Sequence, residues 1–230
     1  MRTSIVSLPL LASLCLALPA LSLTIDNFEQ GNFSVVDVAP GPTLGQQAGL
    51  APDVIGGVRL VRSNATSGGT TTSSLTTTAG PDGAVVSFAD AAAPFGQGDA
   101  SFIYDGIPDG AINGPGGALN LDLSTFYSID VEAAATPGIA DLQLTLWDAA
   151  GSQGSALIPI LNGNNPFVLS SFGLVNLTQI KSIRLSVFGL DPGESVQIAD
   201  ISANETPVPE PGTGFLLALG LAGLALRRPH

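Results

Sequence analysis

The residues that most often carry out enzyme chemistry are scarce in this chain of 230 residues. The only histidine is His230, and the only cysteine, Cys15, lies in an apolar N-terminal segment. Between the two ends, no Ser–His pair, Cys–His pair or histidine-rich zinc site can form. The 19 Asp and Glu residues could supply a glycosidase pair, but most lie in turns beside Gly or Pro. We therefore expect no catalytic residue; an enzyme acting on surface polysaccharide is the less favoured alternative.

The most specific pattern lies in the C-terminal segment. A polar, proline-bearing stretch over 204–214 contains Pro209, Glu210 and Pro211. Each proline fixes its own φ and keeps the preceding residue out of the helical region, so this stretch is extended. An apolar run follows, and Arg227 and Arg228 close it. The order predicts a rigid extended signal, then a hydrophobic helix over 215–230 that ends in a positive stop on the cytoplasmic side of a membrane.

These C-terminal residues resemble the PEP-CTERM sorting signal. The resemblance covers 207–230, with Pro209, Glu210 and Pro211 as its central motif and Arg227 and Arg228 as its basic end. Pro229 and His230 stand where the family has a longer basic end. The resemblance implies an exported protein of a Gram-negative bacterium, processed by the membrane enzyme exosortase and associated with exopolysaccharide or biofilm. An ordinary membrane anchor that is not cleaved is the alternative.

The first 22 residues have the layout of a secretory signal peptide. Arg2 gives a positive start, an apolar run covers about 5–18, and Ala20 and Ser22 supply small residues for signal peptidase. Leu14 precedes Cys15, whereas a lipoprotein signal needs a small residue there. We therefore expect cleavage by signal peptidase, transient anchoring in the inner membrane through the C-terminal helix, and release to the cell surface or extracellular matrix.

The charge balance excludes one class of partner. The formal net charge is −12, and the only basic residues between the two ends are Arg59, Arg62, Lys181 and Arg184. A surface this acidic repels phosphate backbones, so we expect no nucleic-acid partner.

Residues 23–203 show no helical period and instead contain short β-rich runs between turn residues. In the run that ends at Trp147, Leu142, Leu144 and Leu146 alternate with polar residues, as one half-buried face of a sheet requires. Many such runs predict an all-β domain, an antiparallel two-sheet sandwich flanked by the signal helix and the C-terminal helix. A Ser/Thr/Gly-rich stretch over 63–80 is expected to be a mobile loop or a solvated edge strand. The expected strands cover 34–38, 58–61, 84–88, 101–104, 118–121, 126–133, 141–147, 155–160, 167–170, 183–188 and 195–201.

The order of these runs is similar to that of galactose-binding-like and carbohydrate-binding-module jelly rolls. The resemblance rests on Ile25-Asp26-Asn27-Phe28-Glu29, on the stretch Leu177-Thr178-Gln179-Ile180-Lys181-Ser182-Ile183, and on the closing Ile198-Ala199-Asp200-Ile201. It implies a jelly-roll sandwich with a structural Ca²⁺ where the first and last strands meet. Glu29 and Asp200 are then the candidate ligands and Asp26 a weaker one. The alternative is that these acids end strands and face water. The acidic loop 105–114 misses the EF-hand spacing and is expected to be a plain turn.

Trp147 is the candidate carbohydrate-binding residue, because sugar faces pack against aromatic rings. Strict alternation puts it on the polar face with Asp141, Gln143 and Thr145. A buried position in the sandwich core is nevertheless the role we expect for this ring. The sequence thus predicts an exported, non-enzymatic surface or matrix protein, with a carbohydrate-binding module of defined glycan specificity as the first alternative.

Overall fold

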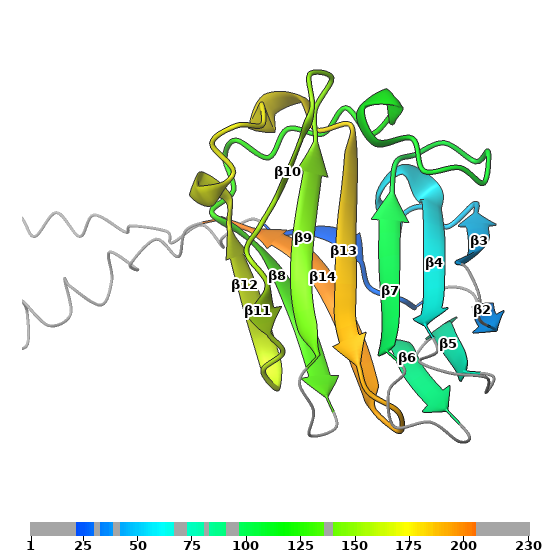
Figure 1. The fold of residues 1–230 in the computed structure, drawn as a ribbon. Helices are drawn as coiled ribbons and strands as arrows, with labels where there is room; N and C mark the ends of the chain where they lie inside the picture. The colour runs from blue at the N-terminus through cyan, green and yellow to red at the C-terminus, as the bar shows by residue number, and fades with distance from the viewer. Residues whose placement is uncertain are drawn as a thin grey trace, which may run out of the picture. The chain divides into compact units, whose positions relative to one another are not determined.

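The fold consists of two antiparallel sheets packed face to face (Figure 1). The computed structural model describes residues 22–29, 33–38, 42–66, 73–80, 83–90, 97–135 and 140–205. The expected all-β, antiparallel two-sheet sandwich is therefore confirmed. The signal peptide over 1–22 lies outside the described residues except for Ser22, and so does the C-terminal segment from residue 206 onward. In the part of the chain that is described, no helix has the length and apolarity needed to span a membrane.

The first sheet, here called sheet I, has the strand order β12-β8-β14-β6-β5-β2. Strand β1 also belongs to sheet I. It pairs with the second half of β14, and β6 pairs with the first half of the same strand. The strands of sheet I are β1 (Ser22–Asp26), β2 (Phe33–Val38), β5 (Ser73–Gly80), β6 (Gly83–Asp90), β8 (Ser128–Ala135), β12 (Gly163–Val168) and β14 (Ser195–Asn204).

The second sheet, sheet II, has the order β10-β9-β13-β7-β4-β3 and lies in front in Figure 1. The short strands β10 and β11 pair with the two ends of β9. Its strands are β3 (Thr43–Ala48), β4 (Val58–Thr66), β7 (Gln97–Tyr104), β9 (Asp141–Trp147), β10 (Ser152–Gly154), β11 (Ile158–Pro159) and β13 (Ser182–Leu190). The short 3₁₀ turns η1 (Ile55–Gly57), η2 (Gly114–Gly116), η3 (Leu169–Ser171) and η4 (Leu177–Gln179) lie in the connections.

The core fills the space between the two sheets with the alternating apolar positions that the sequence marks. Leu142, Leu144 and Leu146 of β9 are fully buried, and the corresponding positions of β13 and β14 behave in the same way. Burying a side chain of this size contributes about 1.5–3 kcal/mol. Phe28 and Phe102 add an edge-to-face pair with ring centroids 5.6 Å apart. Alternation along each strand therefore fixes which face of each sheet is internal.

Three expected features of the strands are wrong. The run 155–160 forms a strand only at Ile158–Pro159, the short β11. Residues 118–121 do not form a strand; only Leu121 makes an isolated bridge, to Ile180, while the N–H of Ala118 donates to Asp105 in a loop. The Ser/Thr/Gly-rich stretch 63–80 contains the end of β4 and the whole of β5, which lies between β6 and β2 and is not at an edge. The hydroxyl-rich composition hid this strand, since β-branched Thr suits a strand as well as a solvated loop.

Candidate functional site

The outer face of sheet II consists of those side chains of its central strands that point away from the core. Because Leu144 and Leu185 face inward and are paired in register, Thr145 and Arg184 face outward together. The same alternation applies to β7 and β4. This outer face is formed by Gln143, Thr145, Trp147, Arg184, Ser186, Phe188, Ser101, Ile103, Leu60 and Arg62.

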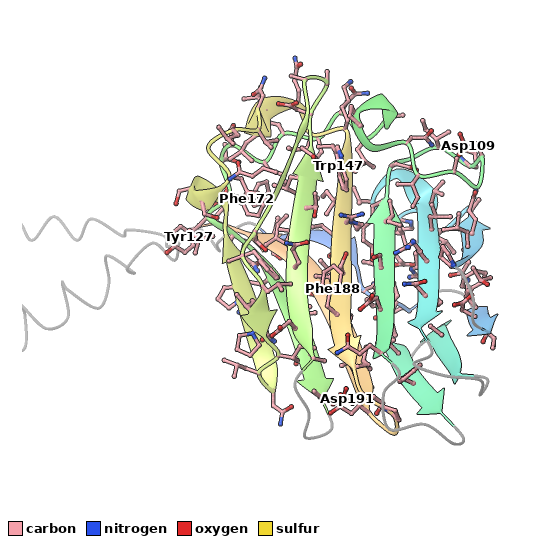
Figure 2. The ribbon with its side chains drawn as sticks, viewed as in Figure 1. Asp109, Tyr127, Trp147, Phe172, Phe188 and Asp191 are labelled. Carbon is pink, nitrogen blue, oxygen red and sulfur yellow. The ribbon has the colours of Figure 1, made fainter. Side chains whose placement is uncertain are left out.

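Trp147 lies at one end of this outer face and is half-buried, so the expected core position is wrong (Figure 2). Strand β9 continues without a bulge to residue 147, and strict alternation therefore keeps the indole on the side opposite to the leucines. The guanidinium carbon of Arg184 lies 5.0 Å from the ring centroid, a cation–π distance. On this face the indole contacts a cation and lies outside the core cluster.

The loop after β7 packs against the same indole. A Cβ built at Gly114 in η2 would lie 3.2 Å from Nε1 of Trp147, and the hydroxyl of Ser182 donates to the Gly114 carbonyl at 3.0 Å. Within this loop, the amide nitrogen of Asn113 donates to the carboxylates of both Asp105 and Asp109 at 3.1 Å. The side-chain amide occupies the space between the two acids. These hydrogen bonds connect the two acids within the loop.

The floor of the outer face is buried, although it points away from the core. Ser101 and Ser186 are almost fully buried and their hydroxyls lie 3.0 Å apart. Ile103 and Leu60, their neighbours on β7 and β4, are also buried. Small and apolar residues at these positions leave room for the longer side chains of Arg62 and Arg184 to extend over them.

Arg184 and Arg62 supply positive charge to this face. Nη2 of Arg184 has one long contact, 3.5 Å, to the hydroxyl of Thr145, and its Nε has no hydrogen-bond partner among the described residues. The pKa of Arg184 is lowered, first by burial and then by repulsion from Arg62. The two guanidinium groups are therefore within electrostatic reach of each other.

Asp26, the weaker calcium candidate, has a different role. Its carboxylate accepts hydrogen bonds from Nε and Nη2 of Arg59, each at 2.5 Å, from the hydroxyl of Tyr104 at 2.9 Å and from the Phe28 N–H at 2.9 Å. All three polar side chains are fully buried. With both oxygens engaged in this network, Asp26 is unavailable to calcium, and that prediction is wrong.

The structure does not bring Glu29 and Asp200 into one depression. Glu29 is exposed after β1, and its N–H donates to the side chain of Asn27. Asp200 lies on the outer face of sheet I, opposite Glu132 in register. A depression of about 340 Å³ there is lined by Asp130, Glu132, Asn164, Asp200, Ser202 and Asn204. Among the described residues, no group of three or more His, Cys, Asp or Glu side chains is arranged to hold a metal ion.

Burial raises the pKa of Asp200, and the neighbouring charges of Glu132 and Asp26 raise it further, while a hydrogen bond with Ser202 acts in the opposite direction. In the same depression, the amide of Asn164 donates to Oδ2 of Asp130 at 2.8 Å. The acids of this surface therefore repel one another. The role of Glu29 and Asp200 as calcium ligands stays a prediction.

Comparison with known proteins decides the nature of the C-terminal segment. Residues 207–228 match the PEP-CTERM protein-sorting motif. The matched residues include Pro209, Glu210, Pro211, Arg227 and Arg228, so the expected sorting signal is confirmed; its structure lies outside the described residues. The motif implies processing by exosortase, and proteins that carry it are exported and sorted to the cell surface. No curated protein matches the chain in sequence.

Two solved structures show limited similarity to the chain. The solution structure of CtCBM11 has 16% sequence identity and a TM-score of 0.43, with 84% of this chain and 100% of that chain covered. The family 11 carbohydrate-binding module of the cellulosomal cellulase Lic26A-Cel5E of Clostridium thermocellum has 14% identity and a TM-score of 0.41, with 83% and 96% covered.

Several residues of the site were not singled out from the sequence. Arg62 and Arg184 are separated by over a hundred positions, and only strand pairing through β7 brings them to one face. Their scarcity was the available signal, since they are two of four basic residues between the ends. Likewise, Asp26 and Arg59 carry no local pattern that marks them as a pair.

Proposed function

We propose that this chain is an exported, non-enzymatic protein of the cell surface or extracellular matrix of a Gram-negative bacterium. Exosortase processes its C-terminal tail, and the β-sandwich is the part that is displayed, in association with exopolysaccharide or biofilm. The observation that carries the proposal is the sorting motif at 207–228, which begins directly after the folded body whose last strand, β14, ends at Asn204.

The order of segments supports a transient membrane stage. Export through the signal peptide places the body outside the inner membrane, while the apolar run holds the tail in the bilayer and Arg227 and Arg228 stay on the cytoplasmic side. In the chain, Pro209-Glu210-Pro211 stands between the sandwich and the apolar run, so we expect a membrane enzyme to reach it there. Cleavage there releases the body from its anchor.

Mass spectrometry of the protein recovered from producing cells and from their medium tests this proposal. We expect the exported pool to lack Arg227 and Arg228, and a strain without exosortase to retain them. A Glu210→Ala variant of the full chain should accumulate in the uncleaved form. An exported pool that still carries the Arg pair would overturn the sorting proposal.

A defined glycan ligand is a second candidate function, favoured by the position of Trp147. The indole lies at one end of the outer face of sheet II and Phe188 lies toward the other, both half-buried (Figure 2). Six residues of strand separate the register positions of these aromatics, roughly 20 Å. A face of this length fits an extended oligosaccharide rather than one sugar.

A glycan array with the processed protein tests this candidate. Binding should be lost in Trp147→Ala and kept in Tyr127→Ala, a control that removes an exposed aromatic from outside this face. A processed protein that binds no glycan would leave a structural matrix role. Release of reducing ends from exopolysaccharide by the purified protein would instead contradict the non-enzymatic proposal.

A further inference from the structure

The four basic residues of the β-sandwich differ in the partners of their side chains. Arg59 pairs with Asp26, and the ammonium of Lys181 donates to the side chain of Asn120. Arg62 and Arg184 have no carboxylate within 4.0 Å among the residues that the structure describes. In a chain with a net charge of −12, carboxylates are abundant. Two arginines without an acidic partner on one face are therefore a specific feature of this surface.

Their spacing follows from the strand register. Arg62 of β4 lies opposite Ser101 of β7, which lies opposite Ser186 of β13; Arg184 is two residues further along β13. Two strand spacings and two residues place the Cα atoms of Arg62 and Arg184 roughly 12 Å apart. The buried pair Ser101 and Ser186 lies between them and offers no bulk that would separate the guanidinium groups.

The acids on the same face do not neutralise this pair. Asp99 lies further along β7, and its carboxylate accepts the Gly189 N–H at 3.2 Å. Asp141 lies at the far end of β9, opposite Phe188. Arg184 is half-buried and lies over the ring of Trp147, and its buried Nε has no hydrogen-bond partner among the described residues. Guanidinium groups bind carboxylate and sulfate groups through paired, charge-assisted hydrogen bonds.

We propose that Arg62 and Arg184 form an anion-binding site for an acidic polysaccharide, with Trp147 as the residue that positions Arg184. This inference rests on the proposed glycan-binding function of the same face and specifies its ligand class: a polymer whose sugars carry carboxylate groups. Each arginine contacts one acidic group of the extended chain. The surrounding acidic surface rejects polyanions elsewhere on the body, so recognition is confined to this face.

Affinity electrophoresis of the processed protein in gels with polygalacturonate, and in gels with its fully methyl-esterified form, tests the inference. The two polymers share one sugar backbone and differ in charge. We expect retardation by polygalacturonate alone, and weaker retardation at higher salt. Each of Arg62→Gln and Arg184→Gln should weaken binding about tenfold, because each removes charge-assisted hydrogen bonds. Lys181→Gln, which removes the same charge outside the pair, should leave binding unchanged.

The outcomes separate this inference from the function on which it rests. Equal retardation by both polymers, unchanged in the arginine variants, would keep glycan binding and overturn the anion site. An equal loss in Lys181→Gln would show general electrostatics and would also overturn it. Retardation by neither polymer would overturn the acidic-polysaccharide inference, while the glycan array decides on other glycans. Because the comparison of the two polymers uses the unaltered protein, it holds even if an arginine variant does not fold.

Discussion

The carboxylate of Asp26 on β1 and the guanidinium of Arg59 on β4 form a two-point ion pair between the two sheets, where both side chains are fully buried. The hydroxyl of Tyr104 and the side chain of Gln47 complete the hydrogen bonds of the pair, and Arg59 also lies 4.7 Å from the ring centroid of Phe28. Burial alone would lower the pKa of Arg59, but the hydrogen bond to Asp26 and the charges around it raise it overall. The pair thus joins one strand of each sheet.

Replacing Asp26 with Ala should strongly destabilise the protein. The substitution leaves the Arg59 charge buried without an anion, and breaking a buried pair in this way costs about 3–5 kcal/mol. Tyr104→Phe removes only one of the four hydrogen bonds to the carboxylate and should cost about 1 kcal/mol. Urea denaturation measures both free energies of unfolding. A smaller loss in Asp26→Ala than in Tyr104→Phe would contradict the structural importance of the pair.

Asp148 should make stability depend on acid pH. Its carboxylate accepts N–H groups from Asn176, Ala150 and Gly151 at 2.7–2.8 Å, and these hydrogen bonds lower its pKa from 3.8. A lowered folded-state pKa means that the contribution is complete above the unfolded value and is lost as pH falls through the folded one. Melting temperatures from pH 7 to pH 2 should therefore show a deficit in Asp148→Asn that shrinks in acid.

Asp122→Asn is the matched control for Asp148. The Asp122 carboxylate is also hydrogen-bonded, with a lowered pKa, but both of its bonds come from Ser124 in its own turn. Asp148, in contrast, joins the turn after β9 to the segment around Asn176. An equal loss of melting temperature in the two variants would show that the hydrogen bond between Asp148 and Asn176 contributes nothing to stability.

Removing the charge of Asp200 should stabilise the protein at neutral pH. Since its pKa is raised, the folded state ionises this group less readily than the unfolded chain. The resulting penalty is absent below the unfolded value of 3.8 and grows as pH rises through the folded pKa. Asp200→Asn should therefore melt at a higher temperature than the unaltered protein at pH 7 and at the same temperature at pH 3.

If Glu29 and Asp200 bind a calcium ion, the opposite change in melting temperature is expected. In that case a chelator would lower the melting temperature of the unaltered protein. Asp200→Asn and Glu29→Gln would then both lower it in the presence of calcium. Melts with calcium and with chelator distinguish the two accounts, and a gain in Asp200→Asn under both conditions would exclude the calcium site.

Substitutions at the neighbouring residues Gly117 and Gly116 test how the loop after β7 packs against the sheet. A Cβ at Gly117 would lie 2.2 Å from the carbonyl oxygen of Lys181, whereas a Cβ at Gly116 meets nothing within 4 Å. Gly117→Ala should therefore cost about 1–3 kcal/mol, as overpacking does, and Gly116→Ala less than about 0.5 kcal/mol. Because η2 contacts Trp147, the only tryptophan in the chain, Gly117→Ala should also shift its fluorescence. An unshifted emission with unchanged stability would contradict this packing.

The sequence by itself determined the features that depend on neighbouring residues. The alternation of leucines in β9 predicted both the strand Asp141–Trp147 and its buried face, because side chains of a strand alternate with a period of two. It also placed Trp147 on the outer face, and only the general preference of large aromatics for cores led to the wrong expectation. The sorting motif at 207–228 was recognisable for the same reason, since its elements are contiguous.

The tertiary structure alone decided which distant residues meet. Asp26 and Arg59, and likewise Arg62 and Arg184, lie on strands whose pairing partners are set by the register of whole sheets. Local sequence patterns do not predict that register, because it results from packing the complete inner faces of the two sheets against each other. For this reason the sequence predicted a sandwich and its sorting signal, whereas the buried ion pair and the unpaired arginines became visible only once the sheets were assembled.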